Sequence, residues 1–507
     1  MRIIDTSDLK ESDRLSSTDK HHIYNGLDCC VTLEVLEALL PQLDNTTSAT
    51  YDFSKSLMAP VLYMNMRGVL TDREAIQDAI ASYSADINRY RSNLDRIIRE
   101  GIGYELPWVG KGGHPSPVAL KAILYDVIGL PPIRKRQPNG TYVSTVNREA
   151  LEKLNVYTIA QPIVSHILAM RDYGKKLGFL RTEVDTDHRI RTSFNIAGTN
   201  TGRLASSLSA FGTGTNLQNI DRRLRRVFVA DPGMKFCNID LEQADARNVG
   251  AICYNLFRDS RYLDACESGD LHTSVCRMAW QHLDWTDDPK HNRAVADQSG
   301  YRELSYRDLA KKLGHGTNYL GTPPTMAKHT KVDVKAITEF QSKYFAAFPA
   351  IRLWHEYVRT EVMTNGRLHN LFNRRRGFFG RRDDESTIRE AVAFSPQSST
   401  AEQINIALLE IFRRNLCEPL VQVHDSLLLQ YPEHLEDTIV PKILSAAKVT
   451  ISLIDGRPFT VPVEAKVGWN WADQSAGNAN GLIKFRGHDV RTRVEVKKTN
   501  VMDRLVY

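Results

Sequence analysis

The chain has 507 residues, of which 42% are apolar and 25% are charged. This length exceeds what one compact core accommodates, so roughly two to four domains are expected. The composition is that of a globular protein and excludes a largely disordered chain. The net charge of +6 is compatible with an anionic partner but does not require one.

The distribution of charge and the cysteine content further restrict the classes of protein to which this chain can belong. The sequence contains two arginine clusters. The first is Arg222, Arg223, Arg225 and Arg226, and the second is Arg374, Arg375, Arg376, Arg381 and Arg382. Two such clusters are the footprint expected of a nucleic-acid-binding protein, although basic runs are usually solvated faces. Seven cysteines without a C-x-x-C pair predict a reduced, cytoplasmic protein rather than a disulfide framework or a zinc site. No apolar run approaches the roughly 20 residues of a membrane helix.

The first third of the chain has mainly helical spacing. Residues 24–43 carry apolar side chains at the positions of one helix face, and a second helical pattern over 52–100 is broken at 67–72, where Thr71 is a candidate N-cap. Loops rich in glycine, proline and basic residues, at 101–117 and 133–145, separate the later helices of this third.

The remaining chain alternates between strand and helix signals. Strand-like alternation over 190–240 ends in "MKFCNID", and a long helical region covers 242–365. Strand signals return at 366–372 and 419–432. This order predicts an α+β fold in which an inserted helical domain interrupts a sheet. The basic tail after 474 is expected to be a solvated terminus, with contact to a nucleic acid or to a protein partner as the alternative.

Two aspartates stand at the ends of predicted strands. Asp240 closes an apolar strand, and Asp425 lies in the turn of a tight hairpin between Pro419 and Pro432. A helix N-cap for Asp240 and an Asx turn for Asp425 are the structural alternatives. If the two carboxylates converge, they form a site for two Mg²⁺ ions that serves in-line phosphoryl transfer.

A stripe of four polar side chains follows one face of a predicted helix over 306–321. These residues are spaced by four and have a glycine on each side of the histidine: Arg307, Lys311, His315 and Tyr319. The two cations suit the phosphates of a nucleoside triphosphate, and the two rings suit its sugar and base. The alternative is a solvated basic helix with a glycine C-cap.

Several motifs together resemble those of the family A DNA polymerases, the DNA polymerase I-like enzymes, particularly the phage replicative members. "DLEQADAR" from Asp240 resembles motif A, D-Y-S-Q-I-E-L-R; the stripe from Arg307 resembles motif B; and "HDS" at 424–426 resembles motif C, H-D-E. "TNTGRLASS", "NLQNI", "DLHTSV" and "PQSSTAE" also resemble family segments and occur in the family's order.

The resemblance implies a right-hand polymerase fold, with a palm built on an antiparallel sheet and with helical fingers and thumb. The implied division is an exonuclease remnant at 1–50, the thumb at 51–190, the palm at 191–255 and 366–473, the fingers at 256–365, and the basic tail at 474–507. The implied activity is template-directed addition of dNTPs to a primer 3′ end in phage DNA replication, in the host cytoplasm.

The resemblance also implies site residues, position by position. Asp240, Asp425 and the Leu241 carbonyl would bind two Mg²⁺ ions, with Lys311 as the third catalytic residue. The dNTP would be bound by Arg307, Lys311, His315, Tyr319, His272, Gln243 and Asp245, the last of which would exclude a 2′-hydroxyl. The primer–template would be contacted by Arg203, Asn216, Gln218, Gln397 and His424.

The chain departs from the family motifs at a few of these positions. Glu242 replaces the motif A serine, and Asp245 replaces the usual glutamate, which shortens the sugar gate by one methylene. His315 stands where Phe or Tyr is usual, and Ser426 replaces the motif C glutamate, leaving two carboxylates in this set. None of these changes removes a residue that the two-metal scheme requires.

Tyr24 and Asp28 resemble the third motif, Y-x3-D, of the family's 3′–5′ exonuclease, in which the tyrosine orients the attacking water and the aspartate binds metal. The other exonuclease motifs belong well upstream, so this chain is expected to lack complete proofreading. A separate exonuclease subunit, a vestigial domain and a truncated reading frame are the alternatives. A processivity factor is a further expected partner.

Two other functions remain open at this stage. One is a catalytically silent primer–template clamp on the same fold, and the other is a single-subunit RNA polymerase. The presence of Asp240, Asp425 and Lys311 disfavours the clamp. The family A segments, together with an acidic residue at position 245, disfavour the RNA polymerase.

Overall fold

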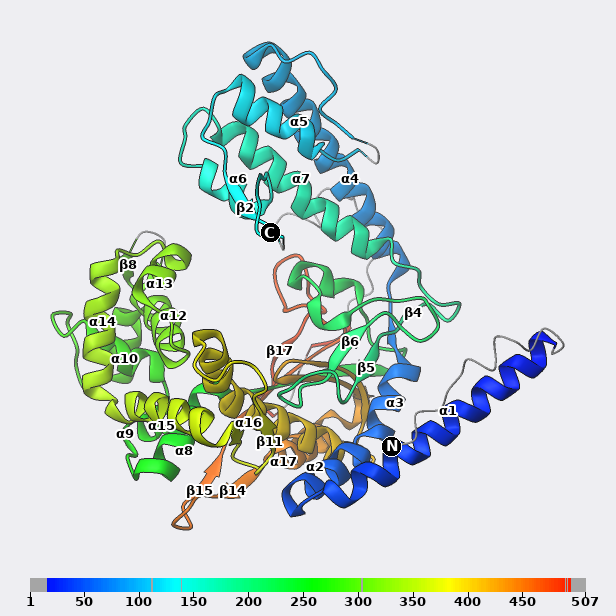
Figure 1. The fold of residues 1–507 in the computed structure, drawn as a ribbon, viewed down its shortest axis with the longest axis vertical. Helices are drawn as coiled ribbons and strands as arrows, with labels where there is room; N and C mark the ends of the chain where they lie inside the picture. Colours follow the sequence, from blue (N-terminus) through cyan, green and yellow to red (C-terminus); the bar gives the residue numbers. More distant parts are fainter. Residues whose placement is uncertain are drawn as a thin grey trace.

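The computed structural model describes residues 16–110, 113–137, 139–301, 304–487, 489 and 491–493. Predictions for residues 1–15 and for the tail from 494 therefore concern residues outside the described ranges. Figure 1 shows two helical lobes, one containing α4–α7 and one containing α9–α14, with a sheet between their bases. Most elements are helices, and the largest sheet is antiparallel, so the predicted α+β class is confirmed.

The first lobe is built on two long helices that pack along each other, α4 and α7. Its helices and its hairpin are α4 (Arg73–Arg96), α5 (Pro117–Lys121), α6 (Arg148–Leu154), α7 (Gln161–Leu180), β2 (Arg134–Arg136) and β3 (Tyr142–Ser144). The predicted N-cap of α4 is wrong by one residue. Asp72 accepts a hydrogen bond from the Ala75 N–H at 2.9 Å, whereas the Thr71 hydroxyl donates to the His188 carbonyl.

The central sheet has five strands in the order β12-β13-β7-β16-β17. Their bounds are β7 (Met234–Leu241), β12 (Glu418–Val423), β13 (Ser426–Pro432), β16 (Val463–Gly468) and β17 (Ile483–Lys484). Phe236, Cys237 and Ile239 of β7 are fully buried, as expected for a central strand covered on both faces. Helices α16 (Glu385–Arg413) and α17 (Glu436–Ala447) pack against this sheet.

The second lobe has its own hydrophobic core, centred on large buried side chains such as Tyr344, Trp354 and Phe394. It consists of α8 (Ala244–Phe257), α9 (Arg261–Glu267), α10 (Leu271–Ala279), α11 (Pro289–Ala296), α12 (Tyr306–Asn318), α13 (Pro323–Thr330), α14 (Val334–Ala347) and α15 (Pro349–Asn365). In the described part of the chain, five further pairs of short strands are present. They are β1 (Val69–Leu70) with β4 (Arg189–Ile190), β5 (Ser193–Asn195) with β6 (Ala205–Ser207), β8 (Ser299–Tyr301) with β9 (Leu304–Ser305), β10 (Arg367–His369) with β11 (Arg375–Gly377), and β14 (Thr450–Ser452) with β15 (Pro458–Thr460).

The N-terminal helix α1 (Ser17–Leu39) projects away from the rest of the molecule in Figure 1. The predicted helix is present, but none of its residues is buried, and Leu33 and Leu39 are 54% and 53% exposed. Two helices connect it to the body, α2 (Asn45–Ser56) and α3 (Met58–Arg67). Within the described residues, no helix is long and apolar enough to cross a membrane, and all seven cysteines are free thiols.

The beginning of the basic tail is not a solvated terminus, contrary to the expectation. Residues 483–484 form β17, which pairs with β16, and Asp489 is 7% exposed. The Lys235 ammonium lies 2.8 Å from the Asp489 carboxylate and 2.7 Å from that of Glu436. Burial would raise the pKa of Asp489, but hydrogen bonds from Arg491 and Lys235 lower it to about 2. Ion pairs with residues distant in the sequence therefore hold residues 483–484 and 489 against the sheet, although the local sequence there does not predict a structured segment.

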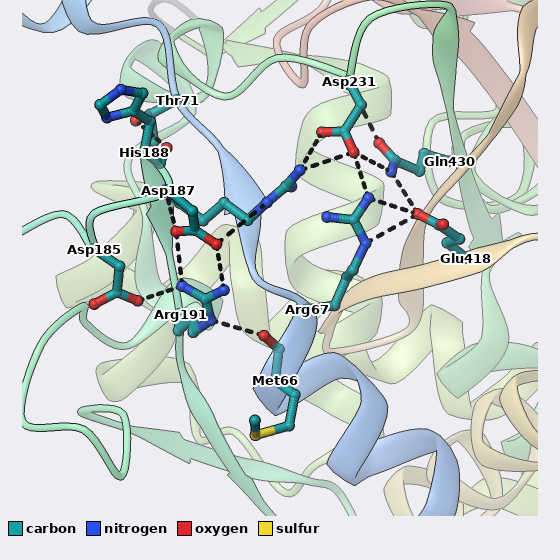
Figure 2. Close-up of polar contacts among 11 residues, drawn as sticks. Met66, Arg67, Thr71, Asp185, Asp187, His188, Arg191, Asp231, Glu418 and Gln430 are labelled. Atoms are coloured by element: carbon teal, nitrogen blue, oxygen red, sulfur yellow. Dashed lines mark hydrogen bonds and ion pairs between the residues drawn. The ribbon is translucent and has the colours of Figure 1, made fainter.

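A network of ion pairs joins α3, β4 and the edge of the sheet (Figure 2). Asp231 accepts hydrogen bonds from Arg67 and from Arg189, the latter at 2.8 Å, and Gln430 donates to it at 3.1 Å. Arg67 also donates to Glu418 of β12 at 2.9 Å. The side chains of the two arginines on Asp231 are 20% and 15% exposed, and Asp231 is the carboxylate that they share.

Asp231→Ala is expected to lower the free energy of unfolding by about 1–3 kcal/mol, because it leaves Arg67 with Glu418 and Arg189 with Asp187 as their remaining acidic partners in a largely buried network. The Arg67 and Gln430 contacts outweigh burial and lower the pKa of Asp231, so its stabilisation is present above about pH 4 and is lost as pH falls below that value. Denaturant unfolding at pH 7 and at a pH well below 4 measures both effects. Asp383→Ala, which breaks an exposed pair with Arg381, is the control and should cause no measurable change.

Candidate active site

The antiparallel pairing of β7 with β13 brings the two predicted aspartates to the same end of the sheet. In this register Ser426 is opposite Asp240, and Asp425 is the last residue of the turn that precedes β13. The Leu241 N–H donates to the Asp425 carbonyl at 3.1 Å. Asp240 and Asp425, 185 residues apart in the sequence, therefore lie side by side on neighbouring strands.

Asp240 and Asp425 form no direct ion pair among the described residues, although Lys466, Arg222 and Arg203 act on them from a greater distance. Limited solvation in the cleft, then the neighbouring Asp425 and Glu464 carboxylates, raise the pKa of Asp240 to about 7. Limited solvation also raises the pKa of Asp425, and the charge of Asp245 adds to this effect. Groups of this kind favour a bound cation, and carboxylate oxygens are the ligands that Mg²⁺ prefers.

The backbone around both aspartates is strained. Gln243, which precedes α8, has a φ of 54°, and His424, which precedes Asp425, has a φ of 55°. Neither residue is a glycine, so each left-handed conformation costs of order 1 kcal/mol. The buried Gln243 Oε1 also has no hydrogen-bond partner among the described residues. Strain and unsatisfied polar atoms of this kind concentrate at functional sites.

A third carboxylate lies on the other neighbour of β7. Glu464 of β16 is opposite Asp240 in the register, and its carboxylate is 3.0 Å from the Lys484 ammonium. Ser426 also lines the cleft, and its hydroxyl donates to the Val423 carbonyl at 2.9 Å. In the part of the chain that the structure describes, no group of three His, Cys, Asp or Glu side chains is arranged to hold a metal by itself. A cation at Asp240 and Asp425 would therefore need ligands from substrate or water.

The predicted cationic stripe lies on α12, and an aspartate orients its first member. The Arg307 guanidinium donates to both oxygens of Asp270, at 2.9 and 3.1 Å. Asp270 also caps α10 and accepts a hydrogen bond from Arg293 at 3.1 Å. Burial, with the charges of Arg307 and Lys311, lowers the pKa of His272 to about 4, so this imidazole is neutral at pH 7. Lys311 itself is exposed.

The aromatic end of the stripe lies near Asp245. The rings of His315 and Tyr319 are 4.7 Å apart, and Asp245 influences the pKa of both. Burial lowers the pKa of His315, and burial followed by the charge of Asp245 raises that of Tyr319. The buried Tyr319 hydroxyl has no hydrogen-bond partner among the described residues. Thr400 of α16 holds Asp245 instead, because its hydroxyl donates to the carboxylate at 2.8 Å.

A cleft of about 610 Å³ opens beside Asp240 and Asp425. The first arginine cluster forms part of its lining, so this cluster is near the aspartates: Arg222, Arg223, Arg225 and Arg226. The second cluster differs, because most of its members pair with carboxylates: Arg374 with Glu402, Arg375 with Asp44, Arg376 with Glu390 and Arg381 with Asp383. Arg382 donates to backbone carbonyls. The second cluster is therefore mainly a set of internal ion pairs.

A sequence model described as DNA polymerase family A matches residues 80–473. The chain belongs to DNA polymerase family A. Among curated family members, the thermostable DNA polymerase I of Thermus filiformis is 28% identical over 462 residues, which cover 86% of this chain and 49% of that protein. DNA polymerase I of Treponema pallidum is 26% identical over 480 residues, covering 89% and 43%. The chain thus spans about half the length of the curated relatives that it matches.

A solved structure of the family has the same fold. The polymerase domain of Pol1 from M. smegmatis, in complex with DNA primer–template and dNTP, has a TM-score of 0.65 at 24% identity. The match covers 82% of this chain and 69% of that chain. The predicted right-hand polymerase fold is therefore confirmed. The proposed domain boundaries stay a prediction.

The residues predicted to contact primer–template lie in two environments in this family A chain. Arg203 is 3.9 Å from Asp245, and His424 lines the cleft, so both are near the aspartates. Asn216 and Gln218 instead hold the chain internally: Asn216 caps a short helix, and Gln218 donates to the Leu204 carbonyl at 3.0 Å. Gln397 is half-buried on α16. Tyr24 and Asp28 are exposed on α1, away from the sheet.

Three residues at the site are absent from the motif-based prediction, namely Glu464, Asp270 and Thr400. Asp270 and Thr400 lie inside the segments "DLHTSV" and "PQSSTAE", which resemble family segments. The resemblance indicated that these segments belong near the site, but it did not indicate a role for these two residues. Glu464 has no local signal, because its relevance comes from its register opposite Asp240. The proximity of Glu464, Asp270 and Thr400 to the site is established only by the tertiary packing of the helices and strands.

Mg²⁺ is expected to raise the melting temperature of the wild type more than that of Asp425→Asn. In the metal-free protein the raised pKa of Asp240 makes stability fall as pH rises from about 4 to 7, because the fold disfavours the ionised carboxylate. Asp425→Asn removes the nearest negative neighbour, so at pH 8 in EDTA it should be more stable by about 1 kcal/mol. Thermal unfolding in EDTA and in Mg²⁺ at matched ionic strength tests this. Equal stabilisation of both proteins by Mg²⁺ would contradict the site.

Proposed function

We propose that this chain is a template-directed DNA polymerase that adds dNTPs to a primer 3′ end by two-metal phosphoryl transfer. The observation that carries this proposal is the β7–β13 register, which places Asp240 beside Asp425 in a family A fold. When bound, two Mg²⁺ ions supply charge stabilisation for the attacking and leaving oxygens. Asp240, Asp425 and the Leu241 carbonyl are the groups in this chain that would hold them.

The side chains of α10 and α12 bind the triphosphate in this proposal. Arg307 is held in place by Asp270, so its fork-shaped donor is oriented before the nucleotide arrives. Lys311 is one helical turn further on the same face and adds a second positive charge. A neutral His272 can donate one hydrogen bond without adding a further charge. Phosphoryl transfer depends mainly on such positioning and charge neutralisation.

The sugar and base lie against His315, Tyr319 and Asp245 in this proposal. Asp245 is shorter than the family's glutamate, and Thr400 holds its carboxylate at 2.8 Å. A fixed carboxylate at this position would exclude a 2′-hydroxyl by contact and by desolvation. The buried Tyr319 hydroxyl, which lacks a partner among the described residues, leaves room for one more hydrogen bond in the occupied site.

Asp425→Asn is expected to reduce primer extension with dNTPs by at least about a thousandfold, because the paired carboxylates are needed for transition-state charge. Binding of a labelled primer–template should be nearly unchanged, because it depends on phosphate contacts and salt. Single-turnover extension and fluorescence anisotropy measure the two properties. Extension at the wild-type rate by this variant would refute the site.

The same assay separates the alternative functions. A catalytically silent clamp binds primer–template but extends with neither dNTPs nor rNTPs. A single-subunit RNA polymerase prefers rNTPs. Asp383→Asn, far from the aspartate pair in the sequence and exposed, is the control for nonspecific charge effects. The role in phage replication and the host cytoplasm as location stay predictions.

We also propose that residues 1–507 alone do not proofread. Tyr24 and Asp28 have the spacing of one exonuclease motif, but in the described part of the chain no cluster of three metal-ligating side chains accompanies them. The apolar surface of α1 is available to a further exonuclease segment or subunit, and a processivity factor is an additional expected partner. A mismatched 3′ nucleotide should therefore persist with Mg²⁺ and the purified chain. Its rapid removal, at the rate of primer extension, would overturn this proposal.

A further inference from the structure

The family match ends at residue 473, but an ordered segment continues beyond it. We call residues 474–487, with 489 and 491, the C-terminal extension. Its strand β17 adds to the sheet edge, and the Leu482 N–H donates to the Ala472 carbonyl at 2.7 Å. Arg491 fastens it by donating to the Ala479 and Gly481 carbonyls, both at 2.9 Å. The extension is therefore built into the sheet that carries the aspartates.

The turn at the start of the extension lines the cleft beside the aspartates. Ser475, Gly477 and Asn478 belong to the same cleft lining as Asp240 and Asp425. Two hydrogen bonds connect the Asn478 and Asn470 side chains, at 2.7 and 3.0 Å, and fix the base of the turn. Ser475 and Gly477 are exposed. The turn thus offers a rigid, uncharged edge to whatever occupies the cleft.

The arginine side of the cleft favours an anionic ligand, whereas its other side carries carboxylates: Asp240, Asp425, Glu464 and Asp473. Arg222 and Arg225 are part of the lining, and the Arg225 guanidinium lies 4.6 Å from the ring centroid of Trp471. The Arg225 Nε and the Trp471 Nε1 are buried donors that lack an acceptor among the described residues. Both unsatisfied groups are donors and are covered in this conformation, so a small movement of either side chain would let it donate to an acceptor such as a phosphate oxygen.

The position of the cleft identifies which part of the substrate it would hold. Its lining includes no residue of α10 or α12, the helices assigned to the triphosphate. In an in-line displacement the attacking and leaving oxygens lie on opposite sides of the reacting phosphorus. On the proposed function, the strand that carries the attacking 3′ hydroxyl therefore lies on the cleft side of Asp240 and Asp425.

From these observations we infer that the C-terminal extension is part of the DNA-binding surface. Its turn 475–478 borders the sugar–phosphate backbone of the growing strand, across the cleft from the arginine cluster. This inference rests on the proposed polymerase function. It assigns to residues beyond the family match a role in holding the duplex next to the metal-binding carboxylates.

The test is a charge change at Gly477. A Cβ at this residue would meet no atom within 4 Å, so Gly477→Glu and Gly477→Lys should fold normally. Gly477→Glu is expected to weaken binding of a fluorescein-labelled primer–template about three- to tenfold at low salt, and Gly477→Lys to tighten it, because the added charge faces phosphates. Fluorescence anisotropy in EDTA without nucleotide measures both, and thermal unfolding checks folding.

Ala479→Glu is the matched control, because residue 479 is exposed in the same extension but does not line the cleft. It should bind as the wild type does. Unchanged affinity of both Gly477 variants, or equal weakening by Ala479→Glu, would overturn the inference. The proposed function is judged separately by wild-type primer extension. If the wild type extends a primer and Gly477→Glu binds normally, the inference alone fails.

Discussion

The pairing of β7 with β13 is the interaction on which the site depends. The turn of the β12–β13 hairpin sets the register, and this register alone brings Asp240 and Asp425 together. A shift by one residue would move every side chain of β7 to the opposite face of the sheet. The buried residues Phe236 and Ile239 lie on opposite faces of β7 and oppose such a shift, because each would lose the packing of its own side of the sheet. Core packing and site geometry are thus fixed by the same hydrogen bonds.

The two lobes contribute to the site from separate cores. The aspartates lie at the end of a sheet that shares a core with α3–α7, whereas Arg307 and Lys311 lie on α12, whose buried face packs in the core of the second lobe. Helix α8 begins three residues after Leu241 and carries Asp245 in its first turn, so it connects the sheet to the second lobe. Relative movement of the lobes would change the separation of the carboxylates from the phosphate-binding cations, and such closure is common when substrates bind.

Local patterns predicted much of this arrangement. The alternation before Asp240, the hairpin around Asp425 and the four-residue spacing from Arg307 are short-range signals, and the structure contains each of these elements. The motifs then indicated the family, and the fold followed from it. The N-cap of α4 illustrates the limit of such signals, because Thr71 and the adjacent Asp72 are both good caps and a contact with His188 decides between them.

Contacts between distant segments could not be predicted in this way. Asp270 with Arg307, Thr400 with Asp245, and Lys235 with Asp489 join residues between 37 and 254 positions apart. The second arginine cluster had the composition of a DNA-binding surface, but its partners Asp44 and Glu402 come from elsewhere in the chain. Charge counts along a sequence cannot distinguish internal pairing from a free surface.

The left-handed residues Gln243 and His424 have a consequence for engineering. Programs of thermostabilisation commonly replace such residues with glycine, which adopts a positive φ without steric cost. At these two positions the relaxed backbone would also release the segments that aim the carboxylates. A glycine at position 243 or 424 should therefore raise thermal stability at the cost of catalytic turnover. Stabilising substitutions are better placed in the two helical lobes than next to the strands that carry the aspartates.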